Sequence, residues 1–151
     1  MRLPFLTKTN SQQNIRRFCD GEIVFRQNDE GRDMFIVQTG GISLTREVSG
    51  QVVEVATLHK GDFVGEMALL ESLPRTATAK AIGTTSLLCI SPGGFLLKIR
   101  RDPTFAFEML QNLSRRIRIT SDRLIEVTHK KSLSQSIIQS VLQSVEFNQK
   151  E

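Results

Sequence analysis

The sequence predicts a mostly β fold with flanking helices. Between residues 22 and 91, short apolar and β-branched runs alternate with glycine-containing turns at close spacing, a pattern typical of a β-barrel or sandwich. After Pro92 the apolar residues recur every three or four positions, which indicates helices. The 151 residues, of which 39% are hydrophobic and 24% charged, suit a single globular domain.

The chain divides by pattern into four segments. These are residues 1–20, a polar stretch; 21–101, the strand-rich domain; 102–131, a long helix; and 132–151, a shorter helix with a tail. In the first segment we expect a short helix around Gln12 to Phe18. We expect the long helix to start at Asp102 and Pro103, because Asp is a good N-cap and Pro a good first helical residue.

Runs in the second segment are expected to form strands: residues 23–25, 34–37, 78–82 and 86–91. Ser49-Gly50 is a turn signal between two β-rich runs, so residues 41–58 are predicted to form a hairpin. Cys89 lies in the apolar run Leu87-Leu88-Cys89-Ile90, which suits a buried free thiol. Two cysteines without an export signal do not indicate a disulfide framework.

The run from Gly61 to Ala79, GDFVGEMALLESLPRTATA, carries the clearest chemical signal. Gly65 allows the backbone to approach a ligand closely, and a short helical piece from Glu66 follows it. The free N–H groups of that helix start attract an anion, and the planar guanidinium of Arg75 can bind a phosphate through two hydrogen bonds. Glu66 would repel a phosphate, so it is expected to accept a hydrogen bond from a ribose hydroxyl. The alternative is a solvated turn followed by a surface arginine.

This run resembles the phosphate-binding cassette of cyclic-nucleotide-binding domains of the Crp/Fnr, catabolite-activator-like type. The matching residues are Gly61, Asp62, Phe63, Gly65, Glu66, Ala68, Leu69, Leu70, Pro74, Arg75, Thr76, Ala77 and Thr78. The resemblance covers roughly residues 13–130 and implies an eight-stranded β-roll, a jelly-roll-like barrel. Asn28 stands in a turn where the family usually has glycine, and Asn tolerates the left-handed backbone expected there.

The resemblance also implies the ligand and its site. Cyclic AMP is the expected ligand and cyclic GMP the alternative. The residues expected at the cyclic phosphate and the ribose are Gly65, Glu66, Met67, Ala68, Arg75 and Thr76. The cyclic phosphate would lie on Arg75 and the backbone N–H groups near Ala68 and Thr76, and the ribose 2′-hydroxyl on Glu66.

The long helix carries an apolar seam with a strict alternation of three- and four-residue steps. Its members are Leu110, Leu113, Ile117, Thr120, Leu124 and Val127. This narrow seam is the pattern of a two-stranded coiled coil and favours a parallel homodimer through residues 105–128; the alternative is a helix packed on its own barrel. A polar break at Ser132 to Ser136 is expected to separate it from a short amphipathic helix that carries Ile137, Ile138, Val141, Leu142 and Val145.

One pair of hydroxyls and one single hydroxyl bear on the choice of base. Thr120 and Ser121 match a threonine–serine pair that meets the adenine in the resembled family, and a hydroxyl can accept from an adenine amino group. Local bonding to the helix backbone is the alternative role. Thr76, directly after Arg75, could instead bond the amino group of a syn guanine, as in cyclic-GMP-preferring relatives. The long helix favours cyclic AMP.

The resemblance does not extend to a helix-turn-helix, because one short helix follows Val127. The chain is therefore expected to be either a stand-alone sensor that signals through an unidentified protein effector or a segment of a larger regulator. DNA binding by this chain alone is not expected, although its net charge is +4. A rival function is a dimerisation scaffold that has lost the ligand.

Catalysis and metal binding are not expected. No nucleophile lies beside a base, and His59, His129 and the two cysteines follow no ligand spacing. No apolar run is long enough to span a bilayer, and the N-terminus lacks a signal-peptide pattern, so a cytoplasmic location without a membrane partner is expected.

Overall fold

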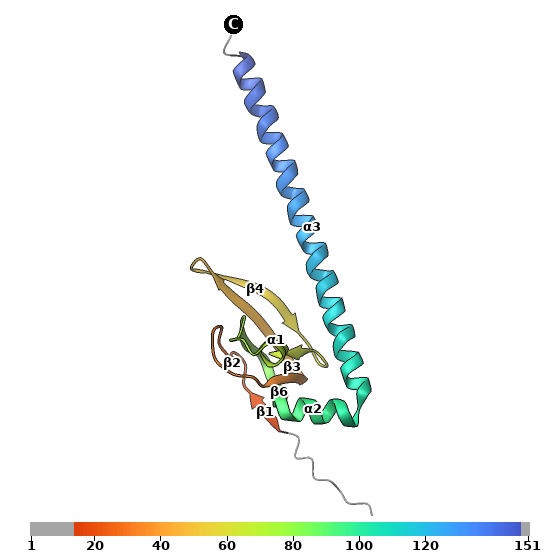
Figure 1. Ribbon diagram of the computed structural model, residues 1–151. Coiled ribbons are helices and arrows are strands. Elements are labelled where there is room, and N and C mark those ends of the chain that lie inside the picture. Colours follow the sequence, from red (N-terminus) through yellow and green to blue (C-terminus); the bar gives the residue numbers. More distant parts are fainter. Residues whose placement is uncertain (1–13, 149–151) are drawn as a thin grey trace, which may run out of the picture. The chain divides into compact units, whose positions relative to one another are not determined.

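The computed structural model describes residues 14–148, with side chains as far as Gln143 (Figure 1). The chain divides after Phe105 into a β-rich unit and a helical unit.

The β-rich unit is a sheet of six strands that are hydrogen-bonded to one another. In chain order they are β1 (Ile15–Phe18), β2 (Ile23–Phe25), β3 (Met34–Val48), β4 (Gln51–Leu58), β5 (Phe63–Val64) and β6 (Thr78–Ile90). The order across the sheet is β1-β6-β3-β4, with β2 also on β6 and β5 also on β3, and every pairing is antiparallel.

Strands β3 and β6 each bend in the middle, and their pairing register shifts between Val37 and Gly41. Gly40 lies at the bend with φ of 73°, and a Cβ on it would collide with the hydroxyl of Thr85. Thr85 is fully buried and donates from Oγ1 to the carbonyl of Gly41 at 3.0 Å. Because each half of the two long strands pairs separately, the six strands supply the eight strand segments of the predicted β-roll.

The core lies inside this bent sheet. It consists of Phe35, Val37, Ile42, Leu44, Leu58, Val64, Ala77, Ala79, Leu87 and Cys89. The predicted hairpin is formed by β3 and β4, and its turn residues Ser49 and Gly50 both have positive φ, 52° and 77°. That geometry matches the twist of the flanking strands.

Helix α2 (Pro92–Arg101) closes the sequence of this unit. Ser91 caps it by accepting from the backbone N–H of Gly94 at 3.2 Å. Phe95 of α2 and Phe63 of β5 both meet the ring of Phe105 edge to face, with centroids 6.0 and 5.9 Å apart. These contacts hold α2 and the first residues of the following helix on the β-rich unit.

The short helix predicted around Gln12 to Phe18 is wrong over the part that the structure describes. Residues Ile15–Phe18 form β1, which pairs with β6 from Ile15 opposite Leu88 to Phe18 opposite Thr85. Gln12 and Gln13 lie outside the described residues. Pairing with a strand far along the chain, rather than local propensity, determines the conformation of this segment.

The polar break predicted at Ser132 to Ser136 is also wrong. Helix α3 runs without interruption from Pro103 to Asn148, 46 residues and roughly 70 Å at 1.5 Å per residue. Ser134 donates from its hydroxyl to the carbonyl of Lys130 at 2.9 Å, and Ser136 to that of Leu133 at 2.8 Å. Because their hydroxyls bond within the helix, these serines do not end it, and the separate C-terminal helix is the last part of α3.

Candidate functional site

The site is built around helix α1 (Glu66–Glu71), which starts directly after β5. Gly65 is its N-cap residue and has left-handed backbone, with φ of 82° and ψ of 6°. Glu66 and Ala68 are buried, with exposures of 3% and 2%, whereas Met67 faces outward. Glycine adopts this left-handed conformation at little cost, so a glycine at position 65 allows α1 to start directly after it.

Arg75 is the central charged group of this region. Its side chain is 5% exposed. Nη1 donates to the carbonyl of Gly65 at 3.2 Å, and Nη2 donates to the carbonyl of Asp33 at 2.7 Å. Both acceptors are neutral, so these bonds position the guanidinium without neutralising it. The Nε–H is buried and has no hydrogen-bond partner within residues 14–148.

Two aromatic rings lie against the same guanidinium. Its central carbon is 4.3 Å from the ring centroid of Phe25 and 5.9 Å from that of Phe35. A cation over an aromatic face is attracted by the ring quadrupole. The two rings also stack on each other, with their centroids 6.1 Å apart.

The backbone of Arg75 is held as firmly as its side chain. Asn28 donates its N–H to the carbonyl of Arg75 at 2.8 Å, and Arg75 donates its own N–H to the carbonyl of Asp29 at 3.0 Å. Asn28 has φ of 69°, the left-handed conformation predicted for this turn. The turn after β2 therefore fixes the point from which Arg75 reaches toward Gly65.

Burial lowers the pKa of Arg75 from its ordinary value, and the nearby acidic groups of Asp33 and Asp29 oppose that effect. An arginine remains protonated in proteins. Arg75 therefore places a permanent positive charge in a partly desolvated setting, which is an environment suited to an anion.

Asp33, whose backbone carbonyl accepts from Arg75, contacts two strands of the sheet through its carboxylate. Its carboxylate lies 3.9 Å from Nη2 of Arg16 and accepts from the thiol of Cys89 at 3.6 Å. Burial and the proximity of Asp33 raise the pKa of Cys89. Cys19 and Cys89 are both free, and Cys89 is the buried thiol that the sequence predicted.

The structure brings the predicted cassette residues together. Gly65, Glu66, Met67 and Ala68 start α1, and Arg75 and Thr76 follow the loop after it. Arg75 bonds back to Gly65, and Thr76 donates from Oγ1 to the sulfur of Met67 at 3.8 Å. A side chain on Gly65 would collide with Nη1 of Arg75, so this close approach depends on glycine.

Thr120 and Ser121 belong to the helical unit, in the middle of α3. Thr120 donates from Oγ1 to the carbonyl of Arg116 at 2.8 Å, which is the local bonding considered as its alternative role. Both residues are exposed. The Thr120 proton is engaged in the helix, and its oxygen lone pairs remain able to accept.

Sequence reasoning missed the residues that hold Arg75 from the other side. Phe25, Asn28, Asp29 and Asp33 contact it from a segment more than 40 positions earlier. One local signal existed, because Asn28 and Gly31 mark a tight turn there. A Cβ on Gly31 would lie 3.3 Å from Nη2 of Arg75, which is a tight contact, so a small residue suits this position.

In the described part of the chain, no group of three or more His, Cys, Asp or Glu side chains is arranged to hold a metal ion. Nor does any helix within residues 14–148 have both the length and the apolar character of a membrane span.

Comparison with known proteins agrees with this geometry. Residues 15–102 match the family described as cyclic nucleotide-binding domain. The chain is 36% identical over 104 residues to the cyclic AMP receptor protein of Thermus thermophilus, covering 68% of this chain and 48% of that protein. It therefore spans about half of that relative's length.

Solved structures give the same result. The crystal structure of Thermus thermophilus catabolite activator protein superposes with a TM-score of 0.67 at 33% identity, over 76% of this chain and 54% of that one. The regulatory domain of Toxoplasma gondii PKA, solved with cAMP, superposes with a TM-score of 0.54 at 25% identity, over 67% of this chain and 38% of that one.

Proposed function

Because this chain belongs to the cyclic nucleotide-binding domain family, we propose that it is a non-catalytic sensor of cyclic AMP. The observation that carries the proposal is the state of Arg75. Its guanidinium is buried against neutral carbonyls, and its Nε–H lacks a partner in the described chain. A buried, unsatisfied cationic donor costs free energy, and an anion that accepts from it recovers that cost.

A cyclic phosphate provides one negative charge and oxygens that accept hydrogen bonds. In the proposed complex, the phosphate lies on Arg75 and on backbone N–H groups near Ala68 and Thr76. Gly65 leaves room for the Arg75 side chain that would bind the phosphate, because a Cβ at this position would collide with Nη1 of Arg75. Met67 lines the outer side of the same turn.

Glu66 is proposed to hold the ribose. It is buried in the first turn of α1, and its charge contributes to the electrostatic surroundings of Arg75. A carboxylate accepts hydrogen bonds and does not donate them. It therefore suits a ribose 2′-hydroxyl and does not suit the phosphate.

The base is proposed to be adenine, read by Thr120 and Ser121. The names of the compared proteins support cyclic AMP, since one is a cyclic AMP receptor protein and another was solved with cAMP. The lone pairs on the Thr120 oxygen suit an adenine amino group. Cyclic GMP, held through Thr76, is the competing ligand.

We further propose that the protein acts in the cytoplasm as a homodimer through residues 105–128 and signals to a protein effector. Ligand binding can signal only if the nucleotide prefers one of two arrangements. The hydrogen bonds of Arg75 indicate how the two arrangements would differ. Its bonds to the carbonyls of Gly65 and Asp33 compete with bonds to a phosphate, so binding would loosen the link between α1 and the residue before β3.

Calorimetric titration of the purified chain with cyclic AMP and with cyclic GMP tests the proposal. We expect Arg75→Leu to weaken binding at least about 100-fold, because two hydrogen bonds to a charged group contribute about 3 kcal/mol or more together. Arg17→Leu, which removes an exposed arginine from β1, is the matched control and should bind normally. Absence of binding by the unmodified chain would refute the sensor and leave a dimerisation scaffold.

A further inference from the structure

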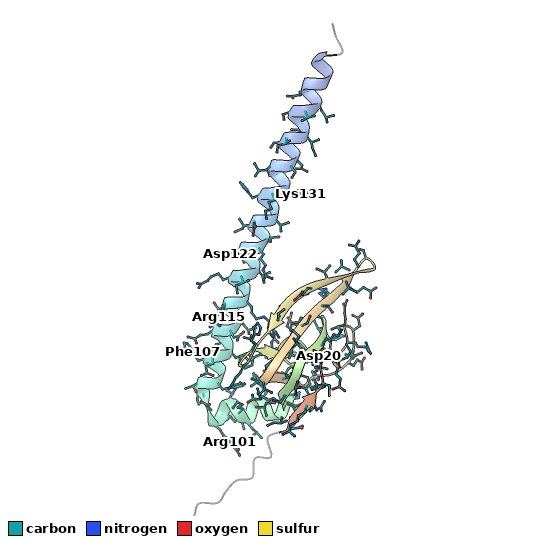
Figure 2. All side chains as sticks on the ribbon, turned by 180° about the vertical axis from the view of Figure 1, so that it is seen from behind. Asp20, Arg101, Phe107, Arg115, Asp122 and Lys131 are labelled. Carbon is teal, nitrogen blue, oxygen red and sulfur yellow. The ribbon has the colours of Figure 1, made fainter. Side chains whose placement is uncertain are left out.

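The distal part of α3 exposes a row of large apolar side chains. Leu133, Ile137, Ile138, Val141 and Leu142 have exposures between 51% and 61%. In Figure 2 the side chains of α3 stand out along the helix, among them the labelled Asp122 and Lys131. A contiguous apolar row of this kind marks an interaction surface.

Two residues of this row, Ile138 and Val141, continue the heptad of the proximal seam without a change of register, whereas Leu133 lies at position c, Ile137 at g and Leu142 at e. With Leu110 at position a, Leu124 and Val127 occupy a and d of the third heptad, and Ile138 and Val141 occupy a and d of the fifth. Between them, Lys131 and Ser134 fill a and d of the fourth. Because α3 is one uninterrupted helix, these positions form one continuous stripe, which drifts around the helix axis by about 20° per heptad and which the supercoil of a coiled coil follows.

We propose that the whole of α3 from Leu110 to Val141 pairs with α3 of a second copy of this chain as a parallel coiled coil, well beyond the residue 128 that bounds the proximal seam. This inference rests on the homodimer of the proposed function and extends it. The distal residues then form a second apolar block, separated from the first by one polar layer.

The flanking charges select the parallel orientation. Positions g carry Arg116, Arg123 and Lys130, and the corresponding e positions carry Ser121, Thr128 and Gln135. In a parallel pair, g faces e of the partner, so each cation meets a neutral polar group. In an antiparallel pair, g faces g, and rows of cations would face one another. At the distal end, Ile137 at g of the fourth heptad faces Leu142 at e of the fifth, and this pair widens the apolar contact.

The polar layer is compatible with burial in such a seam. Ser134 already donates its proton to the carbonyl of Lys130. Lys131 is exposed, and its flexible stem can cover the seam while its ammonium group reaches water. A lysine at a single a position specifies register and oligomer state at a cost in stability. The layer therefore sets the alignment of the two copies.

Disulfide cross-linking in the full chain tests this pairing. In a Cys19→Ser background we would introduce Val141→Cys in the seam, Ser140→Cys outside it as the matched control, and Ile117→Cys in the proximal seam. A disulfide needs Cα atoms about 4.4–6.8 Å apart, so Val141→Cys should form covalent dimers at least about tenfold faster than Ser140→Cys.

Each outcome has a distinct meaning. Cross-linking through Ile117→Cys but not Val141→Cys would refute the distal seam and leave the proximal homodimer. Failure of both variants would refute the dimer, while nucleotide titration would still report on the sensor separately. As a second measurement, Lys131→Ile should strengthen self-association in sedimentation, and an unchanged or weaker dimer would contradict a buried position for this residue.

Discussion

Nη2 of Arg75 donates a hydrogen bond to the backbone carbonyl of Asp33 at 2.7 Å, across 42 positions of sequence. This bond ties the loop after α1 to the residue that precedes β3. It also occupies one edge of the guanidinium that we propose for the phosphate. The guanidinium is thus already bonded to carbonyls of the same chain, and the affinity for a phosphate depends on how strongly these neighbours bind Arg75.

Replacing Gly65 tests the close approach. We expect Gly65→Ala to destabilise the fold by about 1–3 kcal/mol, because its positive φ strains alanine and the new Cβ meets Arg75. Gly50→Ala is the control, since Gly50 has a similar φ of 77° with nothing within 4 Å of a Cβ. Urea unfolding should show the larger loss for Gly65→Ala. Equal losses would mean that contact with Arg75 costs nothing.

Phe25 should stabilise Arg75 through its ring face. We expect Phe25→Leu to cost about 0.5–2 kcal/mol of cation–π attraction in addition to lost packing. A double-mutant cycle with Arg75→Leu separates the two contributions, because the packing loss persists without the cation. Additive effects in chemical unfolding would rule out a direct interaction between the ring and the guanidinium.

The two hydroxyl sites make opposite predictions about the base. Thr76→Ala should weaken cyclic GMP binding and leave cyclic AMP binding nearly unchanged, whereas Ser121→Ala should weaken cyclic AMP binding. Loss of one hydrogen bond between neutral groups corresponds to about 0.5–1.5 kcal/mol. Competition titrations with both nucleotides measure the change. A drop in cyclic AMP affinity with Thr76→Ala alone would transfer base recognition to the cassette.

Because of Cys89, the free energy of unfolding is expected to depend on pH in the alkaline range. Its pKa is raised in the folded protein above the ordinary value of 9.0. As the pH rises, the folded state therefore keeps the thiol proton of Cys89 to a higher pH than the unfolded state does. The stabilisation that Cys89 contributes to the free energy of unfolding is present below about pH 9 and is lost as the pH rises through the folded pKa. Unfolding free energies measured from pH 8 upward should fall less steeply in Cys89→Ala than in Cys19→Ala. Identical slopes would contradict this assignment.

The features that can be predicted from the amino-acid sequence are those with local causes. The hairpin turn at Ser49-Gly50, the glycine before α1, the left-handed Asn28 and the buried thiol of Cys89 all follow from neighbouring residues, and all are present in the structure. The heptad positions of α3 can also be read from the sequence, because a heptad repeat is a property of one helix. Helix continuity at residues 132–136 does not follow from composition, because a serine-rich stretch also suits a break and only the bonds of Ser134 and Ser136 to helix carbonyls distinguish the two.

The contacts between segments far apart in the chain depend on the folded sheet. It made Ile15–Phe18 a strand on β6, and it surrounded Arg75 with Phe25, Asp33 and the turn at Asn28. The physical reason is that strand pairing and burial of a cation are settled by free energies summed over groups far apart in the chain. A motif can therefore name Arg75 as the anion-binding residue, but the contacts that hold it follow from folding of the whole sheet.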